Sequence, residues 1–173
     1  MKRMLSLSLS ALLLLSALAG CGGQGESSGD AAKTPEEYTQ AYQSAIESAR
    51  DQEMNEAIPV ITSTEDEMAS MVLPMVGVTD ENAAAFAVAV SPMNIKAYGI
   101  AAILPAEGKG EEVLEGVNAF VEQQKQSFQQ YLADQYDIAS AAKVETLEDG
   151  TVLLVMCEDQ DTVLESIKTA LNG

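Results

Sequence analysis

The chain has 173 residues, of which 9 are Lys or Arg and 27 are Asp or Glu, so its formal net charge is −18, and it contains no His. Without imidazole, a Ser-His-Asp triad, a Cys-His pair and a His-ligated zinc site are all excluded. The negative charge argues against nucleic acid as a partner, because nucleic acid is bound mainly by clustered Lys and Arg.

The first twenty residues have the pattern of an export signal. Lys2 and Arg3 precede an apolar stretch over 4–18 that is short for a membrane span but typical of a secretory signal. Leu-Ala-Gly follows, directly before Cys21, and this pattern is that of a bacterial lipobox. We therefore predict a lipoprotein signal peptide over 1–20, with lipid on Cys21 holding an exported chain at the outer face of the cell membrane, or of the outer membrane where there is one. The alternative is an ordinary cleaved signal peptide with an incidental cysteine.

A flexible tether is predicted over 21–33, because residues 22–33 carry no large apolar side chain. Residues 34–173 are then expected to form one domain. Its first helix begins at a capping box, in which Thr34 is the N-cap, proline follows and Glu37 stands at the third helical position. Apolar residues recur at helical spacing from there until Pro59 forbids continuation.

A second helix is predicted to start at Thr64 and to end at Pro74. It carries Met68 and Met71, with Met75 just beyond, and thioethers can bind Cu(I). Helical spacing against a core explains the three methionines equally well. Because no His or second thiol lies nearby in the sequence, we interpret them as core residues.

Two hairpins are predicted from runs with the two-residue period of a sheet. One joins 86–91 to 97–104, and the other joins 143–147 to 151–157 through the turn dipeptide Asp149-Gly150. Cys157 ends the last run and is interpreted as a small apolar strand residue rather than a reactive nucleophile.

Helices complete the predicted domain. One runs from about residue 110 to about Leu132, and a final helix is capped by Thr162. The sequence therefore predicts an α+β fold: a small four-stranded antiparallel sheet made of two hairpins, with the helices packed on one face and an additional N-terminal helix.

Acidic residues cluster at 65–67, at Asp134 with Asp137, and at 158–161. No segment has the EF-hand pattern, which leaves only a looser calcium site. Each cluster coincides with a predicted helix start or turn, where acids favour exposed amides. We interpret them as caps and solvated faces rather than as the paired carboxylates of a hydrolase, and we predict no catalytic residue, cofactor or metal ligand.

The stretch 128–137, which reads Phe-Gln-Gln-Tyr-Leu-Ala-Asp-Gln-Tyr-Asp, is followed by Ala-Ala-Lys-Val at 141–144 and by Asp-Gly-Thr-Val-Leu-Leu-Val at 149–155. Together these segments resemble a family of bacterial lipoproteins catalogued as domain of unknown function 4358, over about 65–171. The resemblance implies an exported, lipid-anchored small α+β domain. It implies no activity, cofactor or catalytic residue.

Possible partner-binding residues lie in a predicted loop over 131–137. Tyr131, Asp134, Gln135 and Tyr136 combine aromatic rings with amide and carboxylate groups, as the rims of binding surfaces do. The alternative is that the two tyrosines anchor the end of the preceding helix to the sheet.

The function expected from these features is a non-enzymatic binding or accessory module at the cell envelope. Its partners would be the membrane, through the lipid on Cys21, and an envelope protein or extracellular ligand. A small envelope hydrolase that uses carboxylates, with calcium as a candidate cofactor, is the alternative. A solute-binding lipoprotein is a third hypothesis, although such receptors normally have two lobes and this domain is the size of one.

Overall fold

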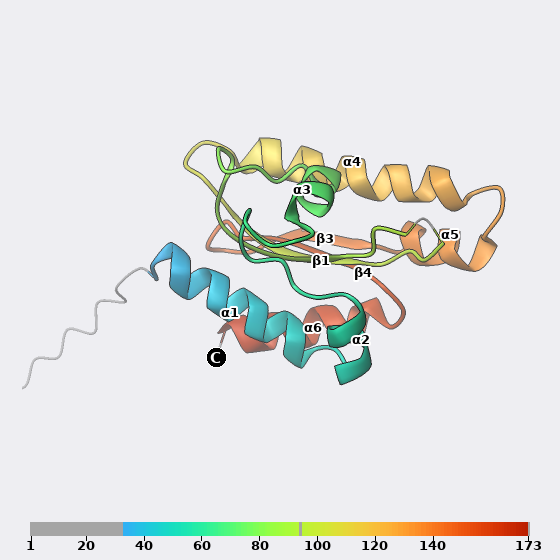
Figure 1. The fold of residues 1–173 in the computed structure, drawn as a ribbon, viewed down its shortest axis with the longest axis horizontal. Helices are drawn as coiled ribbons and strands as arrows, with labels where there is room; N and C mark the ends of the chain where they lie inside the picture. Colours follow the sequence, from blue (N-terminus) through green and yellow to red (C-terminus); the bar gives the residue numbers. More distant parts are fainter. Residues whose placement is uncertain (1–32, 94, 173) are drawn as a thin grey trace, which may run out of the picture. The chain divides into compact units, whose positions relative to one another are not determined.

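The computed structural model describes residues 33–93 and 95–172. The predicted signal peptide, the predicted lipidation site Cys21 and all of the predicted tether except Lys33 lie outside the described residues. Figure 1 shows the fold. In chain order the elements are α1 (Pro35–Ser48), α2 (Gln52–Ala57), α3 (Ala69–Val72), the 3-10 helix η1 (Leu73–Val76), β1 (Ala83–Val90), β2 (Gly99–Pro105), α4 (Gly110–Phe128), α5 (Ala133–Ser140), β3 (Lys143–Thr146), β4 (Val152–Met156) and α6 (Gln160–Asn172).

The four strands form one antiparallel sheet in the order β1-β2-β4-β3. Each predicted hairpin is present, and the two hairpins join through β2 and β4, where Ile100 pairs with Val155. The turn of the second hairpin contains Gly150 with φ of +87°, a conformation that glycine adopts without steric cost. The predicted α+β class and the four-stranded antiparallel sheet are therefore confirmed.

Helices cover both faces of the sheet, so the prediction that they pack on one face is wrong. Figure 1 shows α3 and α4 on one side of the strands and α1 and α6 on the other. The physical reason lies in β1, whose alternation is between large and small apolar residues rather than between apolar and polar ones. Phe86 and Val88 face the core beneath α4, whereas Ala87 and Ala89 face the core beneath α1. A strand buried on both faces reads as continuously apolar.

The capping box of α1 is confirmed. The Thr34 hydroxyl accepts from the Glu37 N–H at 3.3 Å, and the Glu37 carboxylate accepts from the Thr34 N–H at 2.7 Å. The helix ends at Ser48, well before Pro59, because Asp51 caps a separate helix, α2, by accepting from the Met54 N–H at 2.8 Å. The break between the two helices contains Arg50.

Three further element boundaries differ from the sequence prediction. Thr64 starts no helix, since the Asp66 carboxylate instead accepts from the N–H groups of Thr62 and Ser63, at 2.8 and 3.1 Å, and α3 begins only at Ala69. Pro74 lies inside η1 rather than ending a helix. The last helix begins at Gln160 rather than after Thr162, because the Asp159 carbonyl accepts from the Thr162 N–H at 2.9 Å.

The methionines of this region divide between core and surface. Met68 and Met75 are half-buried and pack against the core beneath α4, as the core interpretation predicts. Met71 is 53% exposed, so it does not belong to the core.

One buried polar pair joins α1 to the second hairpin. The Tyr42 hydroxyl and the Thr151 hydroxyl share a hydrogen bond of 2.6 Å, and both residues are buried. Burial raises the pKa of Tyr42, so its hydroxyl stays protonated. This bond fixes the position of α1 on the sheet.

We expect Tyr42→Phe to lower the free energy of unfolding by about 1–3 kcal/mol, because it leaves the Thr151 hydroxyl buried without a partner. Urea denaturation followed by circular dichroism measures the change. Adding Thr151→Val removes the unpaired hydroxyl and is expected to recover part of the loss. A single variant as stable as the wild type would contradict this role for the hydrogen bond.

Candidate functional site

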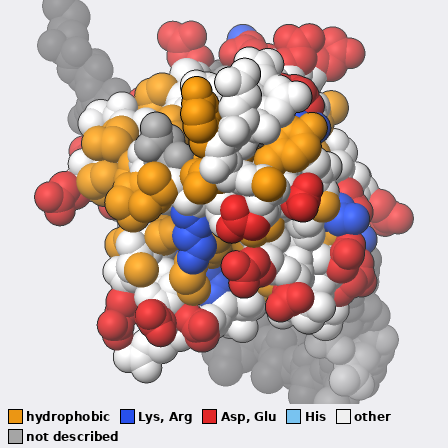
Figure 2. All heavy atoms as spheres, turned by 90° about the vertical axis from the view of Figure 1, so that its right-hand side faces the viewer, with side chains coloured by type: hydrophobic (Ala, Val, Ile, Leu, Met, Phe, Trp, Pro, Cys, Tyr) orange, Lys and Arg blue, Asp and Glu red, His pale blue; other side chains and the backbone are white. Residues whose placement is uncertain are grey.

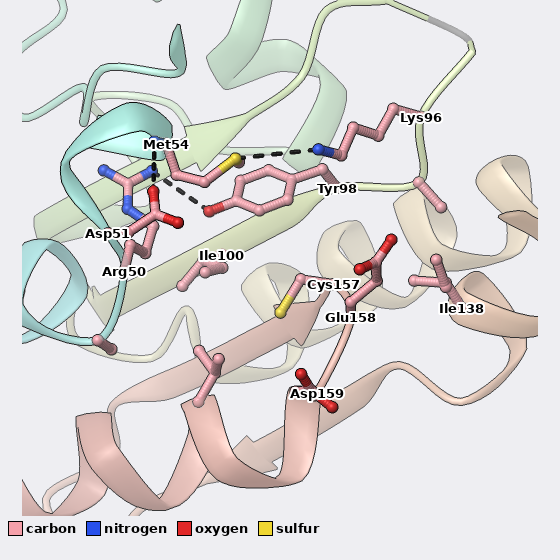
Figure 3. Close-up of a pocket in the computed structure, with 13 residues that line it drawn as sticks. Arg50, Asp51, Met54, Lys96, Tyr98, Ile100, Ile138, Cys157, Glu158 and Asp159 are labelled. Carbon is pink, nitrogen blue, oxygen red and sulfur yellow. Dashed lines mark hydrogen bonds between the residues drawn. The ribbon is translucent and has the colours of Figure 1, made fainter. Parts of the chain in front are cut away.

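A pocket of about 310 Å³ opens where three segments meet: the break between α1 and α2, the connection leading into β2, and the turn between β4 and α6. Figure 3 shows its lining. Tyr98, Ile100 and Cys157 come from the ends of the central strands, which place them side by side. Met54, Ile138 and Val163 add apolar surface from three helices. The strands and helices of the domain therefore hold these side chains in place around the pocket.

Arg50 is held at the edge of the pocket by the break between α1 and α2. Its Nη1 donates to the Ile58 carbonyl at 2.9 Å and, over a longer 3.4 Å, to the Tyr98 hydroxyl. Its Nε and Nη2 are buried and have no hydrogen-bond partner among the described residues. A guanidinium has five N–H donors, and a buried donor without an acceptor costs about 1–3 kcal/mol. Arg50 therefore retains unused hydrogen-bonding capacity beside the pocket.

Lys96 lies on the connection before β2. It is exposed, and its Nζ lies 5.9 Å from the centre of the Tyr98 ring and 3.9 Å from the Met54 sulfur. The same connection is fixed from α5, because the Ala97 N–H donates to Gln135 Oε1 at 2.8 Å. The ammonium group is thus placed next to the pocket by weak contacts with uncharged groups.

Four lysines of the domain lie in ion pairs, whereas the two cations at the pocket do not. Lys109, Lys125, Lys143 and Lys168 each lie within 3.4 Å of a carboxylate oxygen. In the described ranges Arg50 and Lys96 make no such ion pair, and neither do the pocket carboxylates of Asp51, Glu158 and Asp159. This pocket therefore holds unpaired groups of both signs.

Two of the three pocket carboxylates, those of Glu158 and Asp159, come from the opposite side of the pocket to Arg50, whereas Asp51 lies beside Arg50. In Figure 3, Arg50 and Lys96 lie on the side of α2 and β2, whereas Glu158 and Asp159 lie on the side of the β4–α6 turn. Figure 2 views the end of the domain that carries α2, α5 and the β1–β2 connection, and shows basic side chains with acidic and hydrophobic ones around them. Asp159 has φ of +54°, a left-handed conformation that is uncommon outside glycine, at the position that starts α6.

The ionisable groups in the floor of the pocket are held in their neutral forms. Burial raises the pKa of Tyr98, and the hydrogen bond from Arg50 offsets part of that rise. Burial also raises the pKa of the Cys157 thiol to about 11, with Asp159 and Glu158 adding to the effect. Cys157 is 7% exposed and follows directly after β4, which agrees with its interpretation as a small apolar residue.

We expect Cys157 to react slowly with iodoacetamide in the folded protein. With its pKa raised from 9.0 to about 11, the thiolate fraction at pH 8 is about 100-fold smaller than in the unfolded chain. The measurement compares alkylation rates in buffer and in urea for a Cys21→Ser chain, in which Cys157 is the remaining cysteine. Equal rates in the two conditions would contradict the buried, protonated thiol.

Three of the four partner-binding residues predicted to lie in a loop lie instead on a helix. Only Tyr131 precedes α5, where it is 84% exposed, and the other three lie on that helix. Tyr136 packs against the core beneath α4. Gln135 bonds to the connection before β2, and its Nε2 donates to Asp134 at 2.9 Å, which lowers the pKa of that carboxyl. Tyr136 therefore anchors its segment to the core, as the alternative predicted, whereas the exposed Tyr131 does not. A binding role for the four residues stays a prediction.

Two other hollows have different linings. One of about 660 Å³ lies between the β3–β4 hairpin and α6, where Lys168 is already paired with Glu145. The other, of about 570 Å³, lies between the segment 57–62 and α3 and is mainly apolar.

Among the residues placed by the structure, no group of three or more Cys, Asp or Glu side chains is arranged to hold a metal ion. None of the helices in the described ranges is both long enough and apolar enough to cross a membrane.

Residues 60–157 match the family model described as "Domain of unknown function (DUF4358)". The chain belongs to this family. Neither the curated proteins nor the solved structures contain a match to the chain. The DUF4358 region spans the whole sheet, whereas α1, α2 and α6 lie outside it. The pocket therefore combines DUF4358 residues such as Lys96 and Tyr98 with residues from flanking segments such as Arg50 and Asp159.

Sequence reasoning missed this pocket because its charged residues are spread over more than 100 positions. One signal was present. Arg50 is the only arginine after Arg3, and it lies directly before Asp51, a residue type favoured at helix N-caps. Glu158 and Asp159 were assigned to a helix start, and their position across the pocket from Arg50 depends on the packing of α6 and α2.

Proposed function

We propose that this protein is an exported lipoprotein, anchored by lipid on Cys21, whose domain binds a small ligand in the pocket and catalyses no reaction. The observation that carries the proposal is the set of unpaired charges of both signs around an apolar floor. Small-molecule sites are typically concave and mostly apolar, with a few placed polar groups that fix orientation. A pocket of about 310 Å³ is at the small end of such sites.

Binding is favoured over catalysis by the state of the groups that line the pocket. The Cys157 thiol is protonated at neutral pH, so it is a poor nucleophile. Arg50 and Lys96 are suited to hold an anionic group by charge-assisted hydrogen bonds. The pocket thus offers recognition groups rather than an activated nucleophile with its base.

Anchoring at the envelope is supported by the sequence around Cys21. A processed lipobox cysteine carries several acyl chains, and more than one chain is needed for stable attachment to a bilayer. The tether over 21–33 would let the domain reach ligands beyond the membrane surface. Metabolic labelling with an alkyne fatty acid tests this part. We expect label on the wild-type chain and none on Cys21→Ala, and equal label on both would overturn the lipid anchor.

Ligand binding is tested by thermal-shift screening of the full chain, purified in detergent, against small anions, amines and zwitterions. The comparison variant is Lys96→Met with Glu158→Gln, which changes two exposed side chains and keeps the net charge. We expect at least one class of compound to stabilise the wild type and not the variant. If no compound stabilises the wild type, or if each one stabilises both proteins equally, the binding function is contradicted.

A further inference from the structure

We propose that the ligand is a small apolar zwitterion of the amino-acid class, whose carboxylate lies against Lys96 and Arg50 and whose ammonium group lies against Glu158 and Asp159. This inference rests on the proposed binding function and names its ligand. None of these four side chains forms an ion pair with another residue that the structure describes. A ligand with one charge of each sign would complement both ends at once.

The carboxylate end is defined by Arg50 and Lys96, because the Asp51 carboxylate beside Arg50 already caps α2 by accepting from the Met54 N–H at 2.8 Å. Lys96 is exposed, its Nζ contacts the Met54 sulfur and the Tyr98 ring, and it makes no ion pair with a described residue, so a carboxylate can approach it without displacing one. Arg50 supplies two nitrogens, Nε and Nη2, that have no hydrogen-bond partner within the described part of the chain. Both nitrogens are covered by neighbouring groups, so the guanidinium must turn to meet the ligand. A turn that keeps the 2.9 Å bond from Nη1 to the Ile58 carbonyl gives up only the longer contact with the Tyr98 hydroxyl, at 3.4 Å.

The ammonium end is defined by the turn between β4 and α6. Glu158 and Asp159 are consecutive and exposed, and neither is paired with a cation in the ranges that the structure places. The left-handed conformation of Asp159 fixes this turn at the pocket. In Figure 3 the two carboxylates come from the β4–α6 turn, on the other side of the pocket from Arg50, so they are available to a positive group at the other end of the ligand.

The body of the ligand is defined by the apolar lining between the charged ends. Ile100, Ile138 and Val163 offer aliphatic contacts, and burial of an aliphatic side chain against them is favourable by about 25 cal/mol per Å² of apolar surface. A plain inorganic anion would leave this surface and the two carboxylates uncontacted. A simple amine would leave Arg50 and Lys96 uncontacted. A zwitterion with an apolar body can contact the cations, the carboxylates and the aliphatic side chains together.

Isothermal titration of the full chain in detergent tests this ligand class with four probes. L-Leucine and the dipeptide L-leucyl-L-leucine carry both charges on an apolar body, as a free amino acid and as a short peptide. 4-Methylpentanoate lacks the ammonium group, and 3-methylbutylamine lacks the carboxylate. We expect at least one of the two zwitterions to bind at least about tenfold tighter than either singly charged probe. Which of the two zwitterions binds more tightly then distinguishes a free amino acid from a short peptide as the ligand.

Variants then assign the binding to this pocket. Lys96→Met and Glu158→Gln are each expected to weaken zwitterion binding about tenfold or more. Lys125→Met is the matched control for Lys96→Met, since it removes one positive charge from α4, on the opposite side of the sheet from α1. We expect Lys125→Met to bind as the wild type does. Because the substituted side chains are exposed or partly exposed, the variants are expected to fold, and circular dichroism checks this.

Three outcomes would overturn the inference. Tight binding of 4-methylpentanoate or of the amine, with loss in the Lys96→Met or Glu158→Gln variant, would contradict the zwitterion and leave the binding function standing. Zwitterion binding that is unchanged in both pocket variants would place the ligand elsewhere. Absence of binding by all four probes, together with a negative thermal-shift screen, would contradict both the ligand class and the proposed function.

Discussion

Leu153→Ala and Leu154→Ala are each expected to lower the free energy of unfolding by about 2–5 kcal/mol, which is the usual cost of emptying a buried leucine site. The two residues are neighbours on β4, so their side chains point to opposite faces of the sheet. Leu153 packs in the core beneath α1 and α6, and Leu154 packs in the core beneath α4. Both are at most 1% exposed. A loss of stability of this size in both variants is therefore what a sheet covered on both faces predicts.

Urea denaturation of the two variants measures this, with Met71→Ala as the control. Met71 is 53% exposed, so its loss is expected to change stability by no more than about 0.5 kcal/mol. If one leucine variant lost several kcal/mol while the other behaved like the Met71 variant, one face of the sheet would be open to solvent. That result would contradict the layered arrangement seen in Figure 1.

Gly77→Ala is expected to lower the free energy of unfolding by about 2–4 kcal/mol, from backbone strain together with a steric clash. Gly77 ends η1 with φ of +72°, and a Cβ atom there would lie 2.8 Å from the Cα of Gly116 on α4. A Cβ on Gly116 would in turn lie 3.0 Å from the Val76 carbonyl oxygen. The two glycines let η1 and α4 approach backbone to backbone, so neither side can yield by rotating a side chain.

Alanine substitutions at two other glycines distinguish the cost of backbone strain from the cost of the steric clash. Gly150 has φ of +87° but would place its Cβ in open space, so Gly150→Ala is expected to cost only the strain, about 1–2 kcal/mol. Gly110 has neither feature and begins α4, so Gly110→Ala is expected to be neutral or stabilising. Thermal unfolding ranks the stabilities of the three variants. A Gly77 variant no less stable than the Gly150 variant would contradict the close contact between η1 and α4.

Local signals predicted most elements of the fold. The capping box at Thr34 and the turn at Asp149-Gly150 each satisfy their own backbone groups, so they form as the sequence indicates. The two hairpins follow for the same reason, because consecutive strands with a short connection pair with each other. The same logic failed at Thr64, where the nearby carboxylate of Asp66 satisfies the backbone N–H groups instead.

Tertiary contacts decided the features that the sequence did not reveal. The alanines of β1 were consistent with a solvated or a covered face, and only the packing of α1 shows that they are covered. Residues 131–137 were predicted to form a loop, whereas α5 begins at Ala133 and runs to Ser140. Gln135 and Tyr136 fix this helix through contacts with distant residues, which no local pattern encodes. The pocket is the extreme case, since its charged residues come from both ends of the domain.

Amide hydrogen exchange of the full chain tests the ligand pocket most directly when it is measured by mass spectrometry with and without a saturating concentration of whichever of L-leucine and L-leucyl-L-leucine binds more tightly. Binding across the pocket should slow exchange together in the three segments that line it, around residues 49–54, 96–100 and 157–163. The β3–β4 turn, which lies outside the pocket, should exchange at the same rate in both conditions. Unchanged exchange in all three segments, or protection confined to other parts of the chain, would contradict a zwitterion-binding pocket formed by Arg50, Lys96, Glu158 and Asp159.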